Sequence, residues 1–467
     1  MARFRLSVTI FCAIVLALFY GLFLVSYWIL PLPARVSSPE RALAQVVSTA
    51  MTLETGAHQA SGWKRTVSNL MDPPAAQEKT LEEAIHWHEE LLTISKDPVA
   101  QIHLAILQAE AGQSDKVRAE LAQWDSQPEP SPTLAALLKT AYLENDRIPE
   151  QRFLTERAVA SELLPADWFQ DRLIIQMAAR SRHPERAAHK EREISLQAKR
   201  LFRWRFLFVL LDLCLLLLGV TAGVMLVRRR KDLTLGRASI PPSWPVSSGI
   251  TVLLRGGAWG MLLIGLSLFV EGLPLIQTVL LPISCLPTLL LARKHLLQPN
   301  GLPLTQALGF SVDKKLWRLL LLVVIAGMAI EVAGNVLLGI AGNLFHLPNH
   351  WTESFDVDLA WGGPVSIGLN LLQSVVLAPI FEEIIFRGLL FTTLRRRFNG
   401  TVSAVISAGI FGLVHGYGVL GFLTIFLSGI IWAGMMEKTR SLVPGMIAHA
   451  ADNLIFTTGV LAMLRGA

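Results

Sequence analysis

The sequence predicts an all-α, polytopic membrane protein with about nine transmembrane helices and one soluble α-helical domain. Three observations lead to this prediction. Apolar residues make up 52% of the 467-residue chain and charged residues only 17%, against roughly 25% charged residues in soluble proteins. The mean hydropathy is +0.47. The apolar residues fall into long runs separated by short basic clusters, which is the pattern of helices that cross a bilayer.

The charge and cysteine content exclude several classes of protein. The formal net charge is +6. The positive residues stand in short clusters beside apolar runs rather than along one polar face, so we predict no nucleic-acid partner. Cys12, Cys214 and Cys285 lie inside apolar runs without CxxC or Cys/His spacing. Neither a disulfide framework nor a zinc site is therefore predicted.

Residues 1–33 are predicted to form an N-terminal transmembrane anchor. An apolar stretch runs from about Leu6 to Leu32, which at 1.5 Å per residue is long enough to cross ~30 Å of hydrocarbon. A cleaved signal peptide is the alternative. The stretch is about twice as long as the usual core of a signal peptide, and the Ala-x-Ala sequence at Ala42–Ala44 lies far downstream. Both features favour an anchor that stays on the protein.

Residues 34–200 are predicted to be an α-helical domain outside the membrane. Asp97 opens an amphipathic segment that ends at Gly112, and a second segment follows at 115–124, so this part predicts a helical hairpin. Similar segments follow at about 132–145, 150–162 and 167–180. The period of very roughly 35 residues resembles a degenerate tetratricopeptide array. Simple packing of α-hairpins is the alternative.

Eight further apolar spans follow this domain. They lie at about 206–227, 247–269, 273–292, 316–342, 364–394, 401–416, 418–436 and 442–464. We divide this part into transmembrane helices that precede the core, residues 201–295, and a C-terminal core, residues 296–467.

The charges between the spans predict the topology. If the spans simply alternate, four basic clusters fall on one side, at 228–231, 293–294, 314–318 and 395–397. Positive residues favour the cytoplasmic side, and the loop 343–363 on the other side holds three acidic residues and no Lys or Arg. We therefore expect a multi-pass protein of a bacterial inner or cell membrane with residues 34–200 extracytoplasmic. Near the predicted span ends stand four tryptophans that we expect at the lipid interface: Trp28, Trp204, Trp244 and Trp317.

Ionisable side chains inside hydrocarbon are costly, so those in the C-terminal spans are candidates for a functional site. The first group is the sequence from Phe381 to Arg387. On a helix, Glu383 and Arg387 are separated by four residues and can pair, whereas Glu382 points about 100° away from its neighbour. One carboxylate is then held in an ion pair and the other is free to react. A purely structural salt-bridge cluster that joins helices is the alternative.

Two further groups add imidazoles and an amide. Phe411 precedes His415 by one helical turn, and His449 precedes Asn453 by one turn on the same helical face. Together with Glu382, these residues suit the activation of water without a metal. A carboxylate and an imidazole, Glu382 and His415, suit the deprotonation of water, and neutral donors, His449 and Asn453, suit the stabilisation of an oxyanion. Phe411 is expected to support the site by packing.

At these residues the sequence becomes similar to a known family. The order EExxxR, FxxxH and HxxxN on successive spans resembles the CPBP family of intramembrane glutamic endopeptidases, which includes the type II CAAX prenyl proteases. The resemblance covers roughly residues 300–464, including Leu308–Phe310. It implies hydrolysis of peptide bonds without a metal or another cofactor.

The resemblance also implies a role for each residue. Glu382 and His415 would bind and activate the hydrolytic water, and His449 and Asn453 would stabilise the tetrahedral oxyanion. Two further residues, Glu383 and Arg387, would support the site structurally.

For the substrate and the protein partner, the sequence predicts only a general class. A prenylated CAAX protein is one option for the substrate, but the domain at 34–200 favours another peptide or protein that is exported or tethered to the membrane, and this domain could hold a protein partner. The lipid bilayer surrounds the spans. Two alternatives to the glutamic mechanism stay open. One is a non-catalytic scaffold or immunity-type binding protein that acts through the outer helical domain, and the other is a zinc protease that uses Glu382, His415 and His449.

Overall fold

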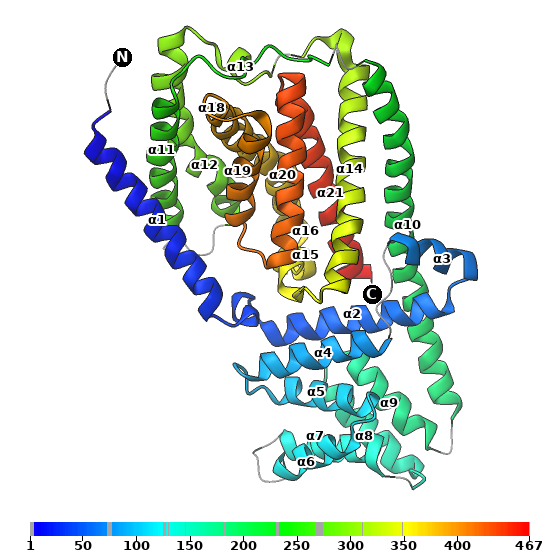
Figure 1. Ribbon diagram of the computed structural model, residues 1–467. Helices are drawn as coiled ribbons and strands as arrows, with labels where there is room; N and C mark the ends of the chain where they lie inside the picture. Colours follow the sequence, from blue (N-terminus) through cyan, green and yellow to red (C-terminus); the bar gives the residue numbers. More distant parts are fainter. Residues whose placement is uncertain are drawn as a thin grey trace. The chain divides into compact units, whose positions relative to one another are not determined.

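The computed structural model describes the whole chain except residues 1–3, 72–76, 125–127, 129, 145, 182–183, 230–232, 268–273, 311, 348 and 467. The described residues contain helices and no named strand, which confirms the all-α prediction (Figure 1). The chain divides into two compact units. We call Met1–Ile29, Leu210–Glu353 and Trp361–Thr458 the membrane unit, and Leu30–Val209, Ser354–Ala360 and Gly459–Ala467 the second unit.

The membrane unit contains α1 (Leu6–Ile29), α11 (Val246–Ser267), α12 (Pro274–Ala292), α13 (Leu304–Ala307), α14 (Trp317–Leu344), α16 (Pro364–Leu371), α17 (Ala378–Glu383), α18 (Thr392–Leu394), α19 (Gly400–Leu413) and α20 (Val419–Thr439). Three helices contribute residues to both units: α10 (Glu185–Arg228), α15 (Val357–Trp361) and α21 (Val443–Gly466). The predicted division at residues 200 and 201 therefore falls inside one continuous helix.

Seven helices of the described chain are long and apolar enough to cross a membrane, namely α1, α10, α11, α12, α14, α20 and α21. The protein is thus a multi-pass membrane protein. Two of the nine predicted spans take another form. The span 364–394 is helical throughout but is divided by π-helical turns, and the span 401–416 is a helix of only 14 residues, α19.

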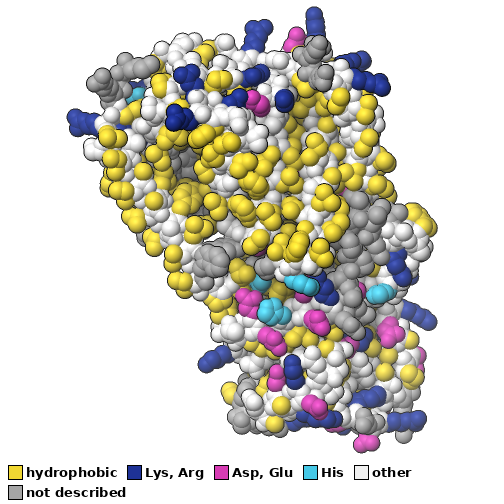
Figure 2. All heavy atoms as spheres, viewed as in Figure 1, with side chains coloured by type: hydrophobic (Ala, Val, Ile, Leu, Met, Phe, Trp, Pro, Cys, Tyr) yellow, Lys and Arg dark blue, Asp and Glu magenta, His cyan; other side chains and the backbone are white. Residues whose placement is uncertain are grey.

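The outer faces of these helices are suited to lipid. The exposed large side chains of α1 and of residues 206–227 of α10 are apolar, and include Leu18, Leu22, Leu217 and Val220. On the face shown in Figure 2, hydrophobic side chains cover the middle of the membrane unit, and Lys and Arg gather at one end of it. Among the predicted interfacial tryptophans, Trp204 and Trp317 are exposed, and the side chain of Trp28 lies outside the described residues.

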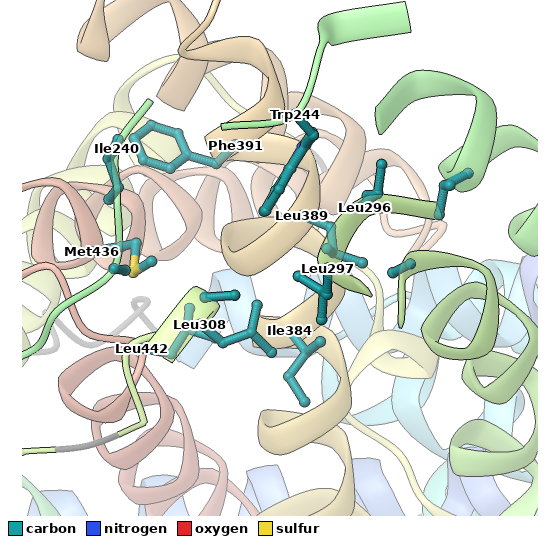
Figure 3. Packing of buried hydrophobic residues seen from close by; sticks show 14 of the residues in the cluster. Ile240, Trp244, Leu296, Leu297, Leu308, Ile384, Leu389, Phe391, Met436 and Leu442 are labelled. Carbon is teal, nitrogen blue, oxygen red and sulfur yellow. The ribbon is translucent and has the colours of Figure 1, made fainter. Parts of the chain in front are cut away.

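The interfacial prediction for Trp244 is wrong. This side chain is 1% exposed and its indole N–H donates to the Thr393 hydroxyl at 3.0 Å. It belongs to a core cluster that packs the segment before α11 and the residues around Leu308 against the helix that follows Glu383 (Figure 3). Phe391 and Leu389 contribute the facing side chains. The cluster holds the helix of the candidate site in place.

The pair α11 and α12 packs closely enough to require glycine. A β-carbon added at Gly256 would collide with Thr288, whereas one added at Gly265 of the same helix would meet nothing within 4 Å. Overpacking typically costs about 1–3 kcal/mol, so we expect Gly256→Ala to lower the unfolding temperature of the detergent-solubilised protein. In contrast, Gly265→Ala should leave it unchanged or raise it, because alanine favours a helix. Thermal unfolding followed by tryptophan fluorescence tests this, and equal unfolding temperatures for the two variants would contradict the packing.

The second unit is built from helices that pack as consecutive neighbours. It contains α2 (Pro39–Gln59), α3 (Gly62–Met71), α4 (Gln77–Leu92), α5 (Pro98–Glu110), α6 (Ser114–Trp124), α7 (Ser131–Leu138), the π-helical η2 (Lys139–Leu143), α8 (Glu150–Leu163) and α9 (Trp168–Ala179). The predicted hairpin is present: Asp97 caps α5 by accepting from Val99 N, Gly112 ends it with φ +74°, and α6 packs back on α5. The tetratricopeptide resemblance stays a prediction.

Two buried histidines lie at the centre of this unit. His88 of α4 and His103 of α5 are 0% and 2% exposed, and the ring of His103 stacks on Phe169 at 3.9 Å. The Nδ1–H of His88 donates to the Ala84 carbonyl, while Nε2 of both rings lacks a hydrogen-bond partner among the described residues. Burial lowers the pKa of His88 to about 4 and that of His103 well below 6.5.

These two pKa values make the second unit sensitive to acid. An unfolded histidine titrates near 6.5, so below that pH the unfolded chain binds protons that the folded unit does not. The stability from His88 is complete above pH ~6.5 and falls by about 3 kcal/mol as the pH drops towards 4. Hydrogen exchange of the α4 and α5 peptides in the full-length protein should therefore accelerate at pH 5 relative to pH 7.5, after correction for intrinsic rates. Replacement of the exposed His86 by Gln should leave this acceleration intact, and a pH-independent protection would contradict it.

Candidate active site

The candidate site begins in a helix with unusual geometry. The span 364–394 contains two π-helical segments, η7 (Leu372–Leu377) and η8 (Ile384–Phe391), on either side of α17. Glu382 and Glu383 are the last two residues of α17. π-helical turns are rare and occur often at functional sites, since each one shifts the side chains that follow it around the helix axis.

Glu383 and Arg387 form a buried ion pair. Both side chains are 0% exposed, and Nη1 of Arg387 donates to Oε1 of Glu383 at 2.9 Å. The guanidinium lies over two aromatic rings, 4.2 Å from the centre of Phe411 and 5.0 Å from that of Trp432. Such cation–π contacts gain strength when they are desolvated. The pairing that the sequence predicted is therefore present, with aromatic support on the guanidinium.

Glu382 differs from its neighbour because its side chain can be reached. It is 18% exposed, whereas Glu383 is fully buried. Its Oε2 lies 3.8 Å from Nε2 of His449. The other ring nitrogen of His449, Nδ1, donates to Oε1 of Glu383 at 3.2 Å. The imidazole of His449 therefore lies between the two neighbouring carboxylates, one sealed and one accessible.

The ring of His449 is held by aromatic side chains. Trp432 of α20 stacks on it with a centroid distance of 4.0 Å and an interplanar angle of 19°. Phe411 of α19 meets it edge-on at 6.1 Å and also contacts the ring of His415 at 4.8 Å. Phe411 thus contacts both histidines and Arg387. Its supporting role in the site stays a prediction.

His415 lies in the turn after α19 rather than within a helix. Its Nδ1 donates to the Phe411 carbonyl at 2.7 Å, so Nε2 of the neutral ring carries the lone pair. The next residue, Gly416, has φ +65°, a left-handed conformation that favours glycine. At the far end of the turn the Gly418 N–H donates to Glu353 at 2.8 Å. His415 makes no ion pair within 4 Å of Glu382 among the described residues.

Asn453 lies one turn beyond His449 on α21, as the spacing predicts. Its Nδ2 donates one hydrogen to the Ser374 carbonyl at 2.7 Å, in the π-helical segment η7. An amide nitrogen carries two hydrogens, so one donor of Asn453 stays available for a ligand. The structure therefore links α21 to both ends of the region around α17. Among the described residues, no group of three His, Cys, Asp or Glu side chains is arranged to hold a metal ion.

Part of the chain is similar to a known protein family. Residues 364–455 match the family model described as type II CAAX prenyl endopeptidase Rce1-like. The C-terminal part of the chain is an Rce1-like domain. All seven predicted site residues fall inside the matched range: Glu382, Glu383, Arg387, Phe411, His415, His449 and Asn453.

A curated relative agrees with this assignment. The chain is 32% identical over 117 residues to the Bacillus subtilis (strain 168) protein named "Putative membrane peptidase YdiL". The alignment covers 25% of this chain and 47% of that protein, so the chain spans about half the length of the relative. No solved structure matches the chain.

One residue of the Rce1-like domain was not predicted from the sequence. Trp432 stacks on His449 and faces Arg387. From its position in an apolar span, the sequence predicts only a packing role for it. A tryptophan inside a membrane helix rather than at its end is the signal that could have marked it, because tryptophan prefers the interface.

Proposed function

We propose that this protein is an intramembrane endopeptidase in which Glu382 activates the hydrolytic water. The observation that carries the proposal is the pair of unequal carboxylates around one imidazole. Glu383 is sealed and paired with Arg387, while Glu382 is accessible and faces His449. A buried ion pair needs only one carboxylate, so the second one is available for chemistry.

The 3.8 Å separation between Glu382 Oε2 and His449 Nε2 suits a bridging water. In the proposed reaction the carboxylate of Glu382 accepts a proton as the water oxygen bonds to the carbonyl carbon of the substrate. Nε2 of His415 supplies a second acceptor for this water, because its Nδ1–H is committed to the Phe411 carbonyl. When the carbon–nitrogen bond breaks, the proton passes from Glu382 to the leaving amine.

The oxyanion of the intermediate needs donors. Asn453 supplies the second hydrogen of its amide group, the one that is not bonded to the Ser374 carbonyl. His449 donates Nδ1–H to Glu383, so its Nε2 can donate only from the charged imidazolium. That charge is compensated by the neighbouring carboxylates. We therefore assign His449 and Asn453 to the oxyanion, with His449 acting as a cation.

We assign residues 1–33 to an anchor, 34–200 to an extracytoplasmic helical domain that binds a protein partner, 201–295 to helices before the core, and 296–467 to the protease core. The membrane is the bacterial inner or cell membrane. The substrate is a peptide or protein that is exported or tethered to the membrane. The relative's name refers to a membrane peptidase, which supports the reaction class.

Membrane proteomics of cells that carry the wild-type protein or Glu382→Ala tests this function. Protein termini should be compared at matched abundance of the two forms. We expect at least one membrane or exported protein to lose a new terminus in the variant and to accumulate uncleaved. If no terminus changes while the variant still supports the wild-type phenotype, the protein is a scaffold that acts without catalysis.

A further inference from the structure

Glu331 is a buried carboxylate without an assigned task. It lies on α14, is 2% exposed, and neither of its oxygens has a hydrogen-bond partner among the residues that the structure describes. An unpaired carboxylate inside a membrane unit is costly whether charged or neutral, because its polar atoms gain nothing in exchange for lost water. An ionisable group at such a position is a candidate for a functional role.

The packing of α14 shows which helix Glu331 faces. Gly327 and Gly334 lie four residues before and three residues after Glu331, so all three share one face of the helix. A β-carbon added at Gly327 would collide with Met435 of α20, and one added at Gly334 would collide with Leu427 of α20. Glu331 therefore faces α20 between these two contacts.

The polar groups of α20 in this interval are Ser428 and Trp432, and both lie near enough to the Glu331 carboxylate to influence its ionisation. Ser428 already donates its hydroxyl hydrogen to the Thr424 carbonyl at 3.2 Å. The indole Nε1–H of Trp432 is buried and has no hydrogen-bond partner in the described part of the chain. One unpartnered donor and one unpartnered acceptor thus face each other across the contact between α14 and α20. Arg387 and Asp452 are the charged groups that interact with Glu331.

Trp432 connects this contact to the site. Its ring stacks on His449 at 4.0 Å and 19°, while its only polar atom, Nε1, lies on the ring edge. A hydrogen bond at that edge fixes the rotation of the indole and therefore the plane that the imidazole packs against. Either protonation state of a carboxyl group offers an oxygen to accept this bond.

We propose that Glu331 is a positioning residue that accepts the indole N–H of Trp432 and thereby holds His449 in its orientation between Glu382 and Glu383. The hydrogen bond is proposed from the fold alone and does not depend on the reaction. Its effect on catalysis rests on the proposed function.

The contact can be measured without a substrate. In the detergent-solubilised, full-length protein with 15N-labelled tryptophan, Trp432→Phe assigns the indole resonance of Trp432. We expect Glu331→Leu to shift this resonance, Glu331→Gln to preserve most of its position, and Asn335→Leu, one turn further along α14, to leave it unchanged. An unmoved Trp432 resonance in folded Glu331→Leu would overturn the proposal.

The catalytic effect is measured by a double-mutant cycle on the substrate identified by proteomics. Glu331→Leu should lower kcat by about tenfold to a hundredfold with little change in KM, and Glu331→Gln should restore most of it. In the Trp432→Phe background the same replacement should have no further effect. Multiplicative losses would overturn the proposal. If the wild-type protein cleaves nothing while the indole resonance responds as expected, the proposed function fails and the contact stands.

Discussion

The variant Glu382→Gln is expected to keep the fold and abundance of the wild-type protein and to lose at least about a hundredfold in the rate of substrate cleavage. A glutamine has the size of glutamate but cannot accept the proton of the attacking water, and general base catalysis contributes about 10²–10⁴ in rate. The side chain is 18% exposed and lies 3.8 Å from His449, so an amide of the same shape can occupy its place. The measurement is the initial rate on purified protein in lipid, with the substrate found by proteomics.

A matched control separates chemistry from general damage. Glu437 pairs with Arg395 at 3.0 Å in the same unit, and its side chain is 21% exposed, close to the 18% of Glu382; Glu437→Gln removes an equal charge outside the candidate site. Because the pair belongs to none of the predicted site residues, this variant should cleave at the wild-type rate. If Glu382→Gln cleaves the substrate as fast as Glu437→Gln, the glutamate mechanism is wrong.

The variant Arg387→Met is expected to be strongly destabilised. It leaves the carboxylate of Glu383 buried with only His449 as a partner, and breaking one side of a buried pair costs about 3–5 kcal/mol. Most folded domains have only about 5–15 kcal/mol to lose. We expect low abundance in the membrane and a lower unfolding temperature in detergent.

The double variant Glu383→Leu/Arg387→Met distinguishes an uncompensated charge from lost packing. Removing both partners leaves no orphaned charge, and apolar replacement of a buried pair is often neutral or stabilising. The double variant should therefore recover much of the stability that Arg387→Met loses. It should not recover cleavage, because His449 loses the acceptor of its Nδ1–H. A single variant as stable as the wild type would show that the pair is not a structural anchor.

Much of the candidate site is predictable from spacing. Residues four apart on a helix share a face, so the pairing of Glu383 with Arg387 and the alignment of His449 with Asn453 follow from the sequence. Apolar run length and basic clusters predict a polytopic helical protein. Asp97 and Gly112 mark the ends of α5 through their local backbone chemistry.

What the sequence does not predict depends on contacts between distant segments. Trp244 is buried against a distant segment, where its indole N–H donates a hydrogen bond to Thr393, 149 residues away. No local sequence pattern predicts this contact. The stacking of Trp432 on His449 is equally non-local. The π-helical turns around α17 arise in an apolar stretch whose composition is also typical of a regular helix.

The central claim is that one water molecule is shared by the Glu382 carboxylate and the imidazoles of His415 and His449. The most direct test is an experimental structure of the full-length protein in a lipid environment at a resolution that shows ordered water. The account predicts a water within hydrogen-bonding distance of Glu382 and of at least one of these rings. A Glu382 carboxylate that is dry, or that lies on the opposite side of the helices from both imidazoles, would contradict it.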